Sequence, residues 1–147
     1  MRRTRIVYVL AFVLLQAGAC FAHHMAVVVN KDNSVTNISS VYLAKIVKAD
    51  RRKWTNGSNI ILVLHRASTG EMSTLQKLNH MSEQEMKSRL TDRKDGIILV
   101  DSDDDVLNTV GSMSGAIGLV EVRAVNNKVK VVKVDGKLPL EKGYLPD

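Results

Sequence analysis

The sequence has 147 residues, of which 45% are hydrophobic and 24% are charged, enough for one ordinary core but too few for two full domains. Its formal charge of +6 is concentrated at the amino terminus: residues 1–22 carry three arginines and no acid, so the excess positive charge on the remaining chain is half as large. This composition argues against a nucleic-acid partner and excludes a disordered chain, a disulfide-rich mini-protein and a multi-pass membrane protein.

The amino-terminal segment has the pattern of an export signal. Residues 2–5 carry the three arginines, and residues 6–15 form an unbroken apolar run. A helix needs about twenty apolar residues to cross the hydrocarbon layer of a membrane, so this run is too short for a transmembrane span. The pattern predicts that residues 1–22 are a signal peptide and that residues 23–147 are exported to the periplasm as a single domain.

Two ways of processing this segment are open. Small side chains at Cys20 and Ala22 fit the −3 and −1 positions of a cleavage site before His23. Residues 17–20 also loosely resemble a lipoprotein box, which would tether the protein through Cys20. The fit of Ala22 favours cleavage before His23. Cys20 is the only cysteine, so the exported chain would then have neither a disulfide nor a reactive thiol.

Apolar runs alternate with segments of helical periodicity along the rest of the chain. Strands are predicted at residues 25–30, 60–64, 97–100, 116–122 and 129–134, and helices at residues 41–47, 71–81 and 103–110, with a further helix opening at residues 82–85. Most strand runs are continuously apolar, which is typical of strands buried on both faces. The pattern predicts a layered α/β domain with a mixed, mostly parallel sheet flanked by helices. The tail after Gly136 is predicted to be loosely held.

The segment with the most chemical information joins the second predicted strand to the helix that follows. Residues 64–71 read LHRASTGE, so a buried strand ends and a short loop opens a helix, which directs free amides and the helix dipole at one spot. Ser68 and Thr69 add hydroxyl donors, and Arg66 can offer a bidentate guanidinium to a tetrahedral oxyanion. The segment predicts an anion site made of Arg66, Ser68, Thr69 and Gly70.

The same residues allow a purely structural interpretation. Residues 68–71 have the pattern of a capping box, in which the Ser68 hydroxyl and the Glu71 carboxylate satisfy the first amides of the helix. Glu71 would also place a negative charge where the charge of an anion should lie, at a cost of about 1 kcal/mol or more. An oxyanion site and a merely capped helix are both open from these residues.

Other candidate chemistry is weaker. The His-His-Met run at residues 23–25 has copper-binding side chains, but a chain terminus is usually solvated. Residues 101–105 begin like a calcium loop without its glycine or its bidentate acid. His65 and His80 lack acids at ligand spacing, and no nucleophile elbow or triad pattern is present. We therefore expect no enzyme activity, no metal site and no cofactor.

Five short stretches of the chain occur in the same order, and with roughly the same spacing, as in a known family. They are residues 28–31, 41–46, 52–57, 66–70 and 115–120, which read VVNK, VYLAKI, RKWTNG, RASTG and GAIGLV. Together they resemble the phosphate-binding periplasmic proteins of ABC transporters, and specifically one of their two lobes. In that family an arginine followed by a Ser-Gly-Thr helix start grips phosphate, which here implies Arg66, Ser68, Thr69 and Gly70. The resemblance covers about residues 25–123 and implies the fold of one lobe.

Two functions follow as hypotheses. The first is an exported solute-binding protein that engages an inorganic oxyanion, phosphate first, in ABC-type phosphate uptake through a membrane permease. The resemblance implies a cleft between two lobes, so a single lobe leaves its ligand half exposed, and binding across a homodimer is open. The second is a protein-interaction module that keeps the lobe fold, has lost anion binding, and meets a protein partner or a second copy of itself.

Overall fold

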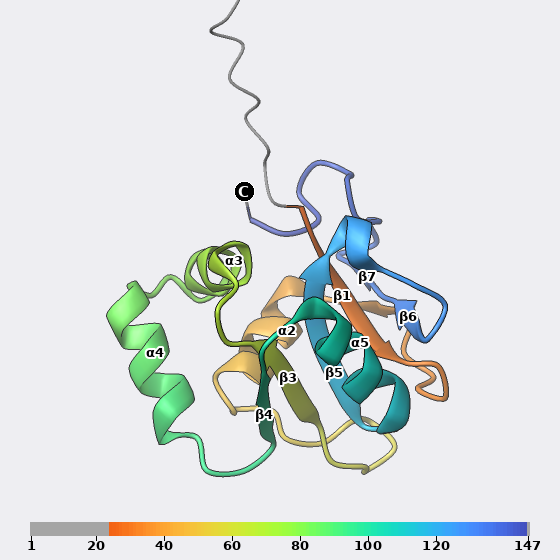
Figure 1. Ribbon diagram of the computed structural model, residues 1–147, viewed down its shortest axis with the longest axis horizontal. Coiled ribbons are helices and arrows are strands. Elements are labelled where there is room, and N and C mark those ends of the chain that lie inside the picture. The colour runs from red at the N-terminus through yellow and green to blue at the C-terminus, as the bar shows by residue number, and fades with distance from the viewer. Residues whose placement is uncertain (1–23, 147) are drawn as a thin grey trace, which may run out of the picture.

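The computed structural model of the chain describes residues 24–146 (Figure 1). The predicted signal peptide, Cys20 and the predicted cleavage site before His23 lie outside these residues. None of the helices in residues 24–146 combines the length and the apolar character that crossing a membrane requires.

A mixed five-stranded sheet organises residues 24–146. In chain order the elements are β1 (Met25–Asn30), β2 (Asn37–Ile38), α2 (Ser40–Val47), β3 (Ile61–His65), α3 (Thr69–Asn79), α4 (Glu83–Asp92), β4 (Ile97–Val100), α5 (Asp103–Ser112), β5 (Ala116–Glu121), the 3-10 helix η2 (Val122–Ala124), β6 (Val129–Val131) and β7 (Lys133–Val134). The strand order is β4-β3-β5-β1-β6, and β2 and β7 form a separate small sheet. β3 pairs in parallel with β4 and β5, whereas β1 pairs antiparallel with β5 and β6. Only β1 therefore runs against the others in the described sheet, which confirms a mixed, mostly parallel arrangement.

Helices cover both faces of this sheet. α5 packs on one face, in a core cluster that includes Val28 of β1 and Val63 of β3. α2 and α3 pack on the other face, in a larger cluster that includes Val27 and Val29 of β1. Because successive residues of a strand point to opposite faces, β1 is apolar from Met25 to Val29, which satisfies both clusters. This explains its unbroken apolar run, and it confirms the predicted layered α/β class.

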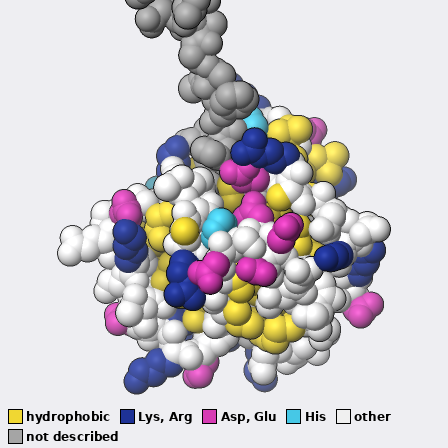
Figure 2. Space-filling model, viewed as in Figure 1, with side chains coloured by type: hydrophobic (Ala, Val, Ile, Leu, Met, Phe, Trp, Pro, Cys, Tyr) yellow, Lys and Arg dark blue, Asp and Glu magenta, His cyan; other side chains and the backbone are white. Residues whose placement is uncertain are grey.

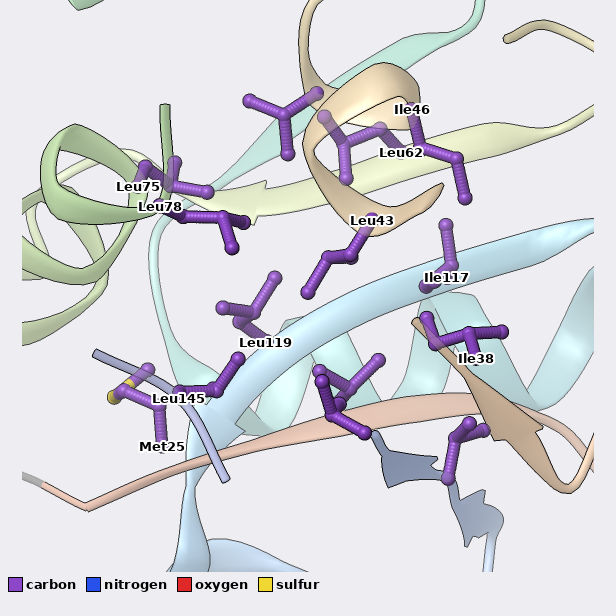
Figure 3. Packing of buried hydrophobic residues seen from close by; sticks show 14 of the residues in the cluster. Met25, Ile38, Leu43, Ile46, Leu62, Leu75, Leu78, Ile117, Leu119 and Leu145 are labelled. Atoms are coloured by element: carbon purple, nitrogen blue, oxygen red, sulfur yellow. The ribbon is translucent and has the colours of Figure 1, made fainter. Parts of the chain in front are cut away.

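The larger core lies between the sheet and the helices α2 and α3 (Figure 3). Aliphatic side chains dominate it, and those labelled in the figure include Leu43 and Ile46 of α2, Leu75 and Leu78 of α3, and Leu62, Ile117 and Leu119 of the sheet. One expectation for α2 is wrong. Val41, which helical spacing predicts to point inward, is 63% exposed, because α2 begins at Ser40 and its inner face is set by Leu43, Ile46 and Val47.

Close backbone packing explains both glycines of the GAIGLV stretch. A Cβ at Gly115 would lie 2.1 Å from the backbone oxygen of Asn59, and a Cβ at Gly118 would lie 2.7 Å from Cγ1 of Val106. Neither approach leaves room for a side chain. The indole N–H of Trp54 donates to the Gly115 oxygen at 3.0 Å, which fixes the buried Trp54 at the same place. These residues therefore serve the packing of the fold.

The carboxyl-terminal segment is anchored, so the prediction of a loosely held tail after Gly136 is wrong. Tyr144 and Leu145 are buried. The Tyr144 hydroxyl donates to the Val132 oxygen at 2.6 Å and accepts from the Val27 amide at 3.1 Å. Tyr144 thereby supplies β1 with a partner from 117 residues away, a contact that local sequence patterns cannot reveal.

Substitution of Tyr144 by phenylalanine is expected to lower the free energy of unfolding by about 1–3 kcal/mol, because a buried amide and a buried carbonyl each lose a partner. Urea unfolding followed by circular dichroism measures this change. Tyr42→Phe is the matched control, since Tyr42 is half-buried and no hydrogen bond of its hydroxyl occurs among residues 24–146; its effect should stay below about 0.5 kcal/mol. Equal losses in the two variants would show that the hydroxyl bridge does not hold the tail.

Candidate anion-binding site

The predicted site lies where the carboxyl ends of β3 and β4 meet, near the middle of the view in Figure 1. β3 ends at His65, and the Arg66 amide then donates to the Val100 oxygen of β4 at 2.9 Å. α3 begins at Thr69 and α5 at Asp103, so two helices start beside the same sheet edge. Open α/β sheets bind their ligands at the carboxyl ends of strands, and the predicted residues are located at such an edge.

The start of α3 presents amides that have no hydrogen-bond acceptor among residues 24–146. The Ser68 hydroxyl accepts from the Glu71 amide at 3.1 Å, and the Ser68 carbonyl accepts from the Met72 amide at 3.1 Å. The first hydrogen bond of the helix ladder is therefore donated by Met72, and the amides of Thr69 and Gly70 precede it. Ser68 also keeps its own hydroxyl proton for donation. These three groups can face an anion, as the sequence predicts.

Glu71 does not close the predicted capping box. Its side chain is only 2% exposed, and its Oε2 accepts from the His65 amide at 3.2 Å instead of turning back to Ser68. The physical reason is the short connection between β3 and α3. The Ser68 amide is already used by the His65 carbonyl at 3.1 Å, while the amide at the strand end is within reach of Glu71. Oε1 of Glu71 has no hydrogen-bond partner in residues 24–146.

Glu71 does not carry the negative charge that its residue type suggests. Burial raises the pKa of Glu71 to about 9; the hydrogen bond from the His65 amide opposes this rise and the charge of Asp103 adds to it. Glu71 is therefore neutral at pH 7, and it does not repel an anion at the start of α3.

Arg66 is already engaged with an acid. Its Nε lies 3.0 Å from Oδ1 of Asp101, and its Nη2 is 3.5 Å from the Leu99 oxygen of β4. The two charged side chains are 58% and 79% exposed, and ion pairs in such positions contribute little to stability. An incoming anion therefore competes with Asp101 for the guanidinium. Arg66 and Ser68 line the same cavity, so two of the four predicted contacts share one opening.

His65 has an acidic partner that the sequence analysis missed. Its Nδ1 lies 3.0 Å from Oδ1 of Asp103, and Oδ2 of Asp103 accepts from the Glu121 amide at 3.1 Å. Asp103 thus ties the end of β3 to the end of β5. The two residues are 38 positions apart, but both follow predicted strands, and a parallel sheet brings such positions to one edge. That shared edge is the signal that would have found the pair.

The acidic run after β4 forms the start of a helix. The hydroxyl of Ser102 caps α5 by accepting from the Asp105 amide at 3.1 Å, and Asp103–Asp105 occupy the first turn, where the helix dipole favours negative charge. No group of three or more His, Cys, Asp or Glu side chains in residues 24–146 is placed to hold a metal ion.

Negative charge surrounds the candidate site. Acidic side chains gather around a histidine near the middle of the face shown in Figure 2. The connection from β4 to α5 contributes Asp101 and the three acids of the first turn of α5. The field at this edge therefore opposes an anion, and Arg66 has to overcome it together with the amides of α3.

A scan against protein-family models finds no match for this chain, and a search of curated proteins finds none either. Solved structures do match. An ABC-type phosphate transport receptor from Vibrio cholerae superposes with a TM-score of 0.66 at 22% identity, over 79% of this chain and 48% of that one. PstS from Borrelia burgdorferi gives 0.64 at 19% identity, over 79% and 49%. A phosphate-binding protein from Stenotrophomonas maltophilia gives 0.63 at 19% identity, over 80% and 40%.

At these identities the likeness establishes the fold. The chain spans less than half the length of each of these three proteins. It therefore has the fold of about one lobe of such a binding protein, which confirms the resemblance seen in the sequence. The Vibrio protein is described as a transport receptor and the Stenotrophomonas protein as a binding protein, and neither description is that of an enzyme.

Proposed function

We propose that this protein is an exported solute-binding protein that holds an inorganic oxyanion, phosphate first, through Arg66, Ser68, Thr69 and Gly70. The observation that carries the proposal is the position of Arg66 beside the capped start of α3, at the carboxyl edge of a sheet with the fold of a phosphate-binding lobe. No bond is broken in this function. The anion accepts hydrogen bonds from the amides and hydroxyls of α3 and pairs with the guanidinium. Periplasmic location and delivery to a membrane permease in ABC-type phosphate uptake are part of the proposal.

The proposed site covers its ligand on one side only, and this limits the affinity. The chain matches less than half of each receptor, and a ligand covered on one side keeps much of its surface in water. We therefore expect a dissociation constant near about 1 mM for the isolated protein, equivalent to about −4 kcal/mol. A second copy of the chain or a permease would cover the other side of the anion.

Isothermal titration of the purified protein with phosphate, sulfate and molybdate at low salt and neutral pH tests the proposal. A saturable heat for one of these anions supports it. No heat with any of them would leave helix capping as the sole role of Ser68.

Replacement of Asp101 by asparagine is expected to raise the affinity for phosphate by up to about fivefold, because an exposed ion pair competes with the ligand by as much as about 1 kcal/mol. The same titration measures the change. Asp50→Asn, in the exposed loop after α2, removes an equal charge elsewhere and should leave the affinity within about twofold. An affinity that falls in Asp101→Asn would contradict competition between Asp101 and the anion.

A second candidate function is favoured by the acidic surroundings and the pairing of Arg66 with Asp101. In this candidate the protein is an interaction module that keeps the lobe fold without binding an anion, and the edge that carries Arg66 meets a protein partner or a second copy. Light scattering at increasing protein concentration tests self-association. A strict monomer that responds clearly to phosphate would contradict this second function.

A further inference from the structure

A cavity of about 230 Å³ opens beside the proposed anion contacts. It lies between the end of β3, strand β4 and the helices α3 and α4. Its walls are mainly apolar and include Met72, Leu75, Leu90 and Leu99. Leu99 is among the few large apolar side chains that are exposed on the described surface. This cavity offers burial that an inorganic anion cannot use.

The volume of the cavity limits what can fill it. An apolar cavity of about 150 Å³ is enough to hold benzene, whereas drug-sized ligands occupy pockets of about 300 Å³ or more. A space of about 230 Å³ therefore suits one ring or a short branched alkyl chain. A phosphate ion, which is polar on every side, would gain nothing from the apolar part of the lining.

Polar side chains line this cavity beside the apolar ones. Arg66 and Ser68 both line the cavity. A ligand whose anionic group is held by these two residues can therefore place the rest of its structure inside the cavity. Lys87 of α4 adds a second cation to the lining, in an exposed pair with Glu83. Two cations and a helix start around one apolar cavity complement a molecule with an anionic head and a small apolar body.

Glu71 supplies a further polar group. It lines the same cavity, is 2% exposed, and its Oε1 lacks a hydrogen-bond partner in residues 24–146. Buried polar atoms are nearly always paired, so an unpaired one needs an explanation. Burial keeps the pKa of this carboxyl high, so in its neutral form it can donate a hydrogen bond to an oxygen of a ligand. The described chain itself offers no such oxygen to Oε1.

We propose that the ligand of this protein is an organic phosphoryl compound, a phosphomonoester or a phosphonate with a small apolar substituent. Its phosphoryl group lies against Arg66 and the start of α3, and its apolar substituent fills the cavity between α3, α4 and β4. This inference rests on the proposed function, because both use the same anion contacts. The inference differs from the proposed function in the ligand. Inorganic phosphate leaves the cavity unfilled, whereas the organic compound makes contact with its apolar lining.

Titrations with inorganic phosphate, phenyl phosphate, phenylphosphonate and benzoate test the inference. Phenyl phosphate or phenylphosphonate should bind about tenfold or more tightly than inorganic phosphate, because burial of the ring adds affinity. Benzoate should bind more weakly than either, since its planar carboxylate has fewer oxygens for Arg66 and the amides of α3. Tighter binding of benzoate would overturn the phosphoryl class.

Leu90→Trp fills the cavity from α4 and should abolish the advantage of phenyl phosphate while leaving inorganic phosphate unchanged. Leu138→Trp is the matched control, because Leu138 is 50% exposed and lies outside the lining. Thr91→Trp fills the cavity from an exposed position and serves if Leu90→Trp does not fold. An advantage of phenyl phosphate that survives both cavity variants would overturn the placement of the substituent.

The outcomes separate the two proposals. Phosphate binding with no gain for the phenyl compounds overturns this inference and leaves the proposed function intact. No binding by any phosphoryl compound overturns both. A gain that disappears in the cavity variants supports both together.

Discussion

Replacement of Glu71 by glutamine is expected to raise the free energy of unfolding at pH 7 by about 3 kcal/mol. The folded protein holds this carboxyl with a pKa of about 9, against an ordinary pKa of 4.5, chiefly because it is buried. At pH 7 the unfolded chain is ionised at this position, so folding has to take up a proton. Glutamine needs no proton and keeps an oxygen that can accept from the His65 amide. Urea unfolding at pH 7 measures the gain.

The raised pKa of Glu71 also makes the free energy of unfolding depend on pH. A folded-state pKa above the unfolded one means that the contribution of Glu71 is fully present below about pH 4.5 and is lost as the pH rises through about 9. Over this window the free energy of unfolding should fall by up to about 1.4 kcal/mol per pH unit. Glu71→Gln should flatten the slope. Glu83→Gln, at an exposed position of α4, should retain it. Parallel profiles for Glu71→Gln and the unaltered protein would contradict a neutral, buried Glu71.

Replacement of Arg66 by alanine is expected to weaken phosphate binding by about ten- to a hundredfold, because charge-assisted hydrogen bonds contribute about 1.5–3 kcal/mol. The loss should fall at the strong end of this range, since removal of Arg66 also leaves Asp101 without the ion pair that holds it. The remaining acids then repel the anion without compensation. Isothermal titration with phosphate at low salt measures the change.

Two further variants show what the arginine contributes. Arg66→Lys keeps the charge and loses the planar fork, so an intermediate affinity would indicate bidentate binding. Arg89→Ala removes one positive charge from an exposed position on α4 and should change the affinity by less than about twofold. Wild-type affinity in Arg66→Ala would remove the anion site as the function of this edge.

The fold was largely predictable because its strongest signals are local. Continuous apolar runs mark β1 and β5 as strands buried on both faces, and the caps at Ser68 and Ser82 mark helix starts within a residue or two. The predicted final strand at residues 129–134 is the exception among the strands. It is divided into β6 and β7, because the Val132 amide donates to β1 while the Lys133 amide donates to the Thr36 oxygen near β2.

The site was less predictable because its features depend on contacts between distant segments. The capping-box pattern at Ser68 cannot show that Glu71 prefers the amide at the end of β3, since this choice depends on a loop length that only the folded backbone sets. Asp103 reaches His65 through the pairing of parallel strands, which spacing along the chain does not reveal. The sequence places Arg66 and Ser68 at one helix start, but it does not reveal that Asp101 pairs with Arg66.

The place of β1 between β5 and β6 has a consequence for how the chain acquires its structure. β1 is the first strand described, yet its sheet partners are β5 and β6, with Met25 opposite Glu121. A chain made from its amino terminus cannot complete this sheet until its last third has emerged, because the closing contacts have high contact order. The topology thus delays folding to the end of synthesis. Such a delay suits a polypeptide that has to be threaded unfolded through a membrane pore, as the predicted export signal requires.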